Sequence, residues 1–152
     1  MKTILVIFLF FSCQVLYSQE DNFIINDLPS EFVNNKDAVL VFLTYTEQDA
    51  RKNGLFWRNT NEYNEYVVKY AKSYTGQKKI LTETELKADP EGINYIFKPV
   101  IIKTDGFRKW PAGFGILEIS SGKVYTKNRM FVNNPSKECK GEIKHIQTLL
   151  SK

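Results

Sequence analysis

The sequence contains very little cysteine and histidine. Its 152 residues include two cysteines, Cys13 and Cys139, and a single histidine, His145. A lone histidine without cysteines at ligand spacing argues against a zinc site. The chain has no Cys-x-x-Cys pair, which excludes redox chemistry of that type. It also lacks a Gly-x-Ser-x-Gly elbow, a phosphate-binding glycine loop and a His-Glu-x-x-His motif, so the sequence predicts no cofactor and no metal.

Charge of one sign is not in strong excess either. Lysine and arginine number 21 against 17 aspartates and glutamates, which gives a formal net charge of +4. The basic residues are dispersed along the chain rather than gathered in one block. Such a weak and scattered excess does not indicate binding to nucleic acid.

Long hydrophobic runs are also absent, and the longest lies at the N-terminus. It covers the eight residues Ile4–Phe11, whereas a membrane-spanning helix needs about 20 apolar residues. Lys2 precedes the run and the small residue Ser18 follows it, before a polar stretch begins. This pattern is typical of a cleaved secretory signal. The sequence therefore predicts a signal peptide over residues 1–18, a single globular domain over 19–152, and a periplasmic or extracellular location.

Cys13 offers an alternative to soluble export, because a bacterial lipoprotein signal also ends at a cysteine that becomes lipidated. The aromatic pair Phe10 and Phe11 stands where that class usually has smaller residues, so soluble export is favoured over a lipid anchor at Cys13. Cleavage after Ser18 removes Lys2 and leaves 134 residues with a net charge of +3. Cys139 would then be the only thiol, which excludes an internal disulfide. The sequence predicts no transmembrane segment in the mature chain.

Hydrophobic patterning predicts two main helices and several strands. Ala38–Tyr45 is a continuous apolar, β-branched run that indicates a strand buried on both faces and central in a sheet. The first helix begins after Asn59, carries a stripe of tyrosines and ends before Gly76. The closing helix carries the apolar stripe of Ile143, Ile146, Leu149 and Leu150. Three further strands are predicted at Ile93–Lys103, Phe114–Ser120 and Lys123–Met130, the last two joined by a tight hairpin.

Three shorter segments are less determined by the sequence. Lys78–Leu86 is compatible with the end of a strand or with a short helix opened by Thr82 and Glu85. A short helix capped by Ser30 is possible at Ser30–Asn35, and residues 46–58 are predicted to form a polar loop. Pro99 inside a predicted strand favours an edge position or a bulge there.

This element order predicts an α+β fold, with a mixed, mostly antiparallel sheet of four to five strands and two main helices packed on it. The order also resembles that of thioredoxin-like domains, with Ala38–Tyr45 as the first core strand and Lys98–Val100 at the place of that family's cis-proline. Thr46–Asp49 stands where the redox thiols of the family lie and contains no cysteine. A degenerate thioredoxin-like domain without redox cysteines is therefore the alternative fold, and the resemblance implies no activity.

Two groups of residues are candidates for chemistry or binding. Phe107, Arg108, Trp110 and Phe114 form an aromatic and cationic segment that is able to grip a sugar, a peptide or a protein surface. The competing interpretation places Trp110 and Phe114 in the core. Glu83, Glu85, Asp89 and Glu91 form an acidic run, with Glu47 and Asp49 in the preceding loop. Paired carboxylates of this kind are used in glycoside hydrolysis.

Cys139 lies near the start of the closing helix, between Lys137 and Lys140, and this setting predicts a lowered thiol pKa. A cysteine nucleophile generally needs a histidine base. His145 is six positions away, about 240° around a helix at 100° per residue, so the two cannot form a dyad on one helix. His145 itself is expected to be a solvated residue, and Cys139 a plain surface or partly buried thiol.

Two hypotheses of function follow. The first is a non-catalytic binding module of the bacterial envelope or exterior, an accessory, inhibitor or immunity-type protein with a protein or glycan partner. This hypothesis predicts that Phe107, Arg108 and Trp110 are exposed together. The second is a small secreted hydrolase, for which Glu47 or Asp49 faces the acidic run across a cleft and one carboxylate is buried.

Overall fold

The computed structural model describes residues 23–52, 60–104, 108–127 and 134–152, without the side chains of residues 51, 52, 101–104 and 108–112. The predicted signal peptide, residues 1–18, lies outside this part of the chain. The elements in chain order are β1 (Phe23–Ile25), α2 (Ser30–Asn34), β2 (Leu40–Thr44), α3 (Glu47–Lys52), α4 (Thr60–Ala71), β3 (Lys78–Thr82), α5 (Glu83–Ala88), β4 (Tyr95–Thr104), β5 (Arg108–Glu118), β6 (Val124–Thr126) and α6 (Pro135–Leu150).

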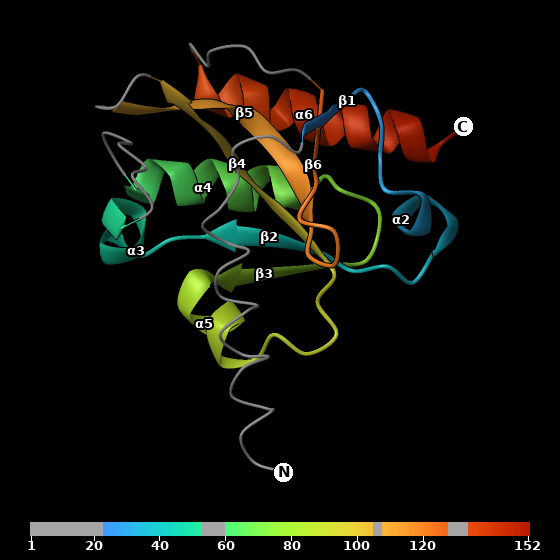
Figure 1. Cartoon of the computed structure of the whole chain (residues 1–152), viewed down its shortest axis with the longest axis horizontal. Helices are drawn as coiled ribbons and strands as arrows, with labels where there is room; N and C mark the ends of the chain where they lie inside the picture. Colours follow the sequence, from blue (N-terminus) through green and yellow to red (C-terminus); the bar gives the residue numbers. More distant parts are fainter. Residues whose placement is uncertain (1–22, 53–59, 105–107, 128–133) are drawn as a thin grey trace.

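The described strands form one six-stranded mixed sheet in the order β1-β6-β5-β4-β2-β3 (Figure 1). β2 runs parallel to both of its neighbours, β3 and β4, and β1 runs parallel to β6. β5 is antiparallel to β4 and to β6, and the β4–β5 pairing is the longest in the sheet. Because β2, β3 and β4 are parallel, all three strands point toward the same side of the sheet. Their amino ends lie on the opposite side.

β2 forms where the sequence predicts the central strand. All five of its residues are buried, since it has a hydrogen-bonded strand on each side and packing on both faces. The continuous apolar run Leu40–Leu43 is the composition that such a doubly covered parallel strand requires.

The β4–β5 hairpin contains an irregularity near Pro99. The register between these strands shifts between Val100 and Ile101, directly after the proline. β4 lies in the interior of the sheet and is not an edge strand. Of the two alternatives predicted for Pro99, the bulge is therefore the one that the structure shows. Gly115 lies opposite Lys98, and a Cβ there would come within 2.6 Å of the Tyr125 carbonyl oxygen. A glycine at this position therefore permits close approach of β5 and β6.

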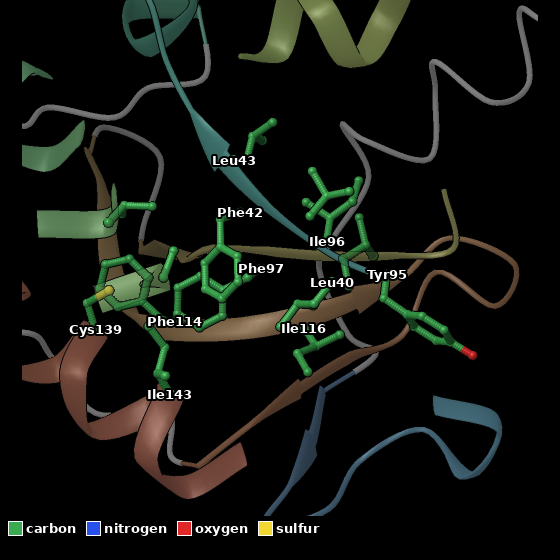
Figure 2. Close-up of a cluster of buried hydrophobic side chains, with 14 of the residues drawn as sticks. Leu40, Phe42, Leu43, Tyr95, Ile96, Phe97, Phe114, Ile116, Cys139 and Ile143 are labelled. Atoms are coloured by element: carbon green, nitrogen blue, oxygen red, sulfur yellow. The ribbon is translucent and has the colours of Figure 1, made fainter. Parts of the chain in front are cut away.

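Helices α4 and α6 pack against each other and cover one face of the sheet (Figure 1). The core between them and the sheet is aromatic. The ring of Phe114 stacks on Phe97, with centroids 5.5 Å apart, and lies nearly parallel to the ring of Tyr63 on α4. Figure 2 shows Phe42, Phe97 and Phe114 side by side, with Cys139 and Ile143 of α6 reaching toward the same cluster. These contacts fix the sheet to both long helices.

The α+β class, the mixed sheet and the two main helices predicted from the sequence are confirmed. The sheet has six strands rather than four to five, because β1 and β3 join it at the two edges. Three of the five neighbouring strand pairs are parallel, so the balance of strand directions differs from the antiparallel one that was predicted. The direction of a strand depends on how the chain crosses the sheet between strands. Hydrophobic patterning gives no information about these connections.

Several local expectations have different outcomes. Lys78–Leu86 contains both a strand and a helix: β3 ends at Thr82, and Thr82 then caps α5 in a capping box with Glu85. Ser30 is the first residue of α2 rather than its cap, and the cap position is occupied by Pro29. The described peptide bonds are all trans, including that before Pro99, so the cis-proline implied by the thioredoxin resemblance is absent. The predicted loop at 46–58 begins with the short helix α3.

Candidate functional site

Of the four residues in the predicted binding segment, the structure describes the side chain of Phe114 alone. Phe107, and the side chains of Arg108 and Trp110, lie outside the described residues, so their common exposure stays a prediction. Phe114 is 1% exposed and packed between Phe97 and Tyr63. This is the core position of the competing interpretation, and Phe114 is therefore not available to contact a partner at the surface.

A polar cluster lies where β2 and β3 end, and it includes a lysine from within β4. We call Tyr45, Asp49, Glu83 and Lys98 the strand-end cluster. Tyr45 follows β2 directly, Asp49 lies on α3, and Glu83 opens α5 directly after β3. Lys98 is on β4, with its side chain on the face opposite that of Phe97 because neighbouring strand residues alternate. In open parallel sheets this edge is where ligands generally bind.

Asp49 is 8% exposed, and its carboxylate is held by hydroxyl groups. The Thr46 hydroxyl donates to Oδ2 at 2.8 Å, and the Thr84 hydroxyl on α5 donates to the same atom at 3.4 Å. The Asp49 amide donates back to the Thr46 hydroxyl at 3.1 Å. Asp49 thus connects the segment after β2 with α5, which carries part of the acidic run.

Glu83 is 4% exposed and forms an ion pair with Lys87 one turn later on α5. Lys98 lies close enough to Glu83 for its charge to matter. Burial lowers the pKa of Lys98 to about 8, and the negative charge of Glu83 opposes that shift. Burial, with the charges of Glu83 and Asp49, raises the pKa of the Tyr45 hydroxyl. A buried lysine with a lowered pKa beside a carboxylate occurs both in functional sites and in structural ion-pair networks.

The strand-end cluster is close to electrically balanced. Its two carboxylates are those of Asp49 and Glu83. Its own amine, that of Lys98, and the amine of the adjacent Lys87 balance these two charges when all four groups are ionised. Within the described ranges no group of three or more histidine, cysteine or acidic side chains is arranged to hold a metal ion. The arrangement is suited to fixing the ends of β2, β3 and β4 relative to one another.

A pocket of about 570 Å³ lies at the opposite, amino-terminal edge of β2 and β4. We call it the α2 pocket. Three stretches of the chain form it: α2 with the turn after it, the start of β2, and the segment leading into β4. The residues that line it are Glu31, Asn34, Asn35, Asp37, Ala38, Val39, Gly92, Asn94 and Tyr95.

Backbone and side-chain hydrogen bonds fix the first wall of the α2 pocket. α2 ends at Asn34, and the Asn35 amide donates to the Glu31 carbonyl at 3.1 Å. The Asn35 side chain then accepts the Asp37 amide at 3.0 Å, and the Ala38 amide donates to the Asn35 carbonyl at 3.0 Å. The hydrogen bonds of Asn35 therefore stabilise a tight turn, and they fix the backbone that carries Asn34 and Asp37.

The second wall is equally constrained. Gly92 has φ +74°, a conformation that glycine adopts without strain, and its Cα faces open space. The Asn94 carbonyl accepts the Ile119 amide at 2.9 Å, which ties this wall to the end of β5. Tyr95 is buried against Phe32 of α2, with ring centroids 4.8 Å apart. Figure 2 shows the Tyr95 ring pointing away from the stacked phenylalanines. Phe32 and Tyr95 thereby join the two walls.

The electrostatics of the α2 pocket are one-sided. The described residues that line it include two carboxylates, Glu31 and Asp37, and no basic side chain. Among the described residues, neither carboxylate has a hydrogen-bond or ion-pair partner. Burial raises the pKa of the Tyr95 hydroxyl, and the charges of Glu118 and Glu31 raise it further. The α2 pocket thus has unneutralised negative charge, unlike the strand-end cluster.

The residues singled out on the closing helix do not form a catalytic pair. α6 continues through Gly141, so Cys139 and His145 stay on different faces. Cys139 is fully buried, and burial, followed by the charge of Glu142, raises the pKa of its thiol. The predicted lowering of this pKa is wrong because burial outweighs the neighbouring lysines. His145 is half-buried rather than solvated: Nε2 is buried without a partner, and burial lowers its pKa.

Glu142 is a site that sequence reasoning missed. It is buried on α6, and both of its carboxylate oxygens accept the Lys127 amide just after β6, at 3.0 and 3.1 Å. Burial raises its pKa to about 8 despite this contact. The only sequence signal was its place among Cys139, Ile143 and Ile146, one helical face that is otherwise apolar.

Comparison with known proteins identifies no relative. No family model, no curated protein and no solved structure matches this chain. None of the helices in the described ranges has the length and apolar character that a membrane span requires.

Proposed function

We propose that this chain is an exported, non-catalytic binding module of the bacterial envelope or exterior, of the accessory, inhibitor or immunity type. We further propose that the α2 pocket receives its partner. The observation that carries this proposal is the pocket itself: about 570 Å³, within the range of roughly 300–1,000 Å³ that is usual for ligand sites. Its lining is rich in hydrogen-bonding groups, and it contains no serine, threonine, cysteine, histidine or lysine beside the carboxylates.

The geometry of the α2 pocket favours recognition over catalysis. Glu31, Asn34, Asp37 and Asn94 are exposed and carry hydrogen-bonding side chains on a backbone that is already fixed. A preformed site loses little conformational freedom on binding, which favours affinity. The predicted binding segment from Phe107 to Trp110, of which residues 108–110 belong to β5, remains a second candidate contact of the same binding module.

The α2 pocket is tested with the double variant Glu31→Gln/Asn34→Ala. Neither side chain makes a hydrogen bond within the described structure, so we expect the variant to keep the wild-type stability to within about 0.5 kcal/mol, as for surface substitutions generally. Immobilised wild-type protein is used to recover partners from envelope extract. The affinity of each identified partner is then measured by calorimetry. We expect the pocket variant to bind about tenfold more weakly, which corresponds to the loss of one or two hydrogen bonds.

Glu65→Gln is the matched control, because Glu65 is also an exposed helical glutamate but lies on α4, away from the pocket lining. Trp110→Ala is measured in parallel and tests the predicted binding segment separately. If the pocket variant and the Glu65 control bind every recovered partner as well as the wild type does, the α2 pocket is not the binding site.

The strand-end cluster supports a second candidate, a carboxylate-dependent hydrolase. Asp49 and Glu83 are both buried, and Asp49 reaches α5 through Thr84. Glycoside hydrolysis needs two carboxylates in different environments. The ion pair of Glu83 with Lys87 argues for a structural role, because a paired carboxylate is a poorer acid or nucleophile.

The hydrolase candidate predicts that Asp49→Asn or Glu83→Gln abolishes turnover of a panel of chromogenic glycosides, with a loss of about a thousandfold or more. Glu47→Gln serves as the control, because Glu47 is exposed on the same short helix as Asp49. Wild-type protein that hydrolyses no member of the panel above background would eliminate this candidate and leave the binding module standing.

A further inference from the structure

Resting on the proposed function, we propose that the α2 pocket recognises a cationic group, and specifically an arginine side chain that a protein partner presents. The charge balance of its lining supports this proposal. Glu31 and Asp37 contribute two carboxylates, and the described residues of the lining include no compensating lysine, arginine or histidine. Lys36, which lies between Asn35 and Asp37 in the sequence, is not part of the lining.

The contrast with the strand-end cluster shows why these carboxylates matter. Glu83 is neutralised by Lys87, and Asp49 accepts two hydroxyl groups. In the described structure Glu31 and Asp37 have no such partner, although the chain as a whole has a net charge of +4. A locally negative pocket on a basic protein attracts cations and repels anions. An anionic ligand is thereby disfavoured.

Hydrogen-bond geometry favours a guanidinium over a smaller cation. A guanidinium has five N–H donors in a planar fork, and it binds carboxylates through two parallel hydrogen bonds. The pocket offers carboxylate oxygens from Glu31 and Asp37 and amide oxygens from Asn34 and Asn94. A divalent metal ion is less well matched, since no group of three acidic, histidine or cysteine side chains occurs in the described ranges.

The surroundings of the pocket indicate a protein as the source of the arginine. Val33, which directly precedes the lining residue Asn34 on α2, is an apolar residue that is 43% exposed. Protein interfaces commonly combine a buried arginine with an apolar contact and a surrounding rim of polar groups. A neutral sugar would also find hydrogen bonds here, but it would leave the two negative charges without a counterpart.

The proposed preference for a guanidinium group is tested by NMR titration with three probes. They are N-acetyl-arginine amide, its neutral isostere N-acetyl-citrulline amide, and N-acetylglucosamine. We expect the arginine probe to shift the backbone amides of residues 31–39 and 92–95, and to bind at least about tenfold more tightly than the citrulline probe. Raising the salt concentration from 20 to 500 mM is expected to weaken the arginine probe alone.

The double variant Glu31→Gln/Asp37→Asn removes the two charges and keeps the shape of the side chains. It is expected to lose the preference for arginine over citrulline. The matched control is Glu47→Gln/Glu65→Gln, which removes two exposed charges outside the pocket lining and keeps that preference.

The outcomes separate this inference from the proposed function. Equal binding of citrulline or N-acetylglucosamine at the same amides would overturn the arginine proposal and leave a binding pocket in place. If no probe shifts these amides, the arginine proposal fails. The proposed function fails with it only if Glu31→Gln/Asn34→Ala also leaves the affinity for recovered partners unchanged.

Discussion

Phe114→Ala is expected to lower the free energy of unfolding by about 3–5 kcal/mol, the range for removing a fully buried phenylalanine. Phe114 is 1% exposed and contacts three aromatic rings, those of Phe97, Tyr63 and Tyr66. Alanine would leave a cavity at the junction of β5 with α4, where neighbouring rings cannot easily collapse into the space. Chemical denaturation monitored by circular dichroism measures this change.

Phe114→Leu is the graded control, because it retains most of the buried volume and is expected to lose about 1–2 kcal/mol. Ile25→Ala provides the surface reference, since Ile25 is an exposed apolar residue on β1. If Phe114→Ala unfolds at the same denaturant concentration as the wild type, Phe114 does not occupy the core. The earlier interpretation of Phe114 as a contact residue would then regain support.

Glu142→Gln is expected to change how stability depends on pH. Burial raises the pKa of Glu142 to about 8 in the folded protein, from an ordinary value of 4.5. Between these values the folded state keeps a proton that the unfolded state has lost, so the contribution of this group to stability decreases as the pH rises from about 4.5 to about 8. The full shift corresponds to about 5 kcal/mol as an upper limit, at 1.36 kcal/mol per unit.

Glutamine cannot ionise, so this decrease should be missing from the variant. We expect Glu142→Gln to exceed the wild type by about 2–4 kcal/mol at pH 9, after allowance for the imperfect replacement of the hydrogen bonds to the Lys127 amide. At pH 4 the two proteins should differ by less than about 1 kcal/mol. Urea denaturation at pH 4, 7 and 9 measures both differences.

Glu65→Gln is the control for a general effect of removing one negative charge, because Glu65 is an exposed glutamate on α4 and does not contribute to the raised pKa of Glu142. Parallel stability profiles of Glu142→Gln and the wild type across this pH range would contradict the prediction. They would indicate that water reaches the carboxylate of Glu142 in solution.

The sequence predicted those elements whose determinants are local. The run Leu40–Leu43 is buried on both faces, and the helices that carry the tyrosine and isoleucine stripes, α4 and α6, are the two longest. β1 was missed because its three residues are too few to show a period. The ambiguity at Lys78–Leu86 arose because Thr82 serves both as the last residue of β3 and as the cap of α5.

The candidate sites were less accessible because each joins distant parts of the chain. The α2 pocket combines residues 31–39 with residues 92–95, and these meet only because β4 pairs with β2. Lys98 had a signal, as a single lysine within the apolar stretch Tyr95–Ile102, but nothing local indicated that Glu83 would lie near it. Asp49 and the acidic run were considered together from the sequence, and the structure does bring Asp49 to α5.

The pairing of β1 with β6 has a consequence for biosynthesis. Phe23 is aligned with Val124, so the first described strand finds its partner about one hundred residues later. Because synthesis starts at the N-terminus, β1 stays unpaired until almost the whole domain has been synthesised. Contacts between such distant residues form slowly, because a large loop must close first. We expect the edge of the sheet at β1 to form last, after most of the chain has been synthesised.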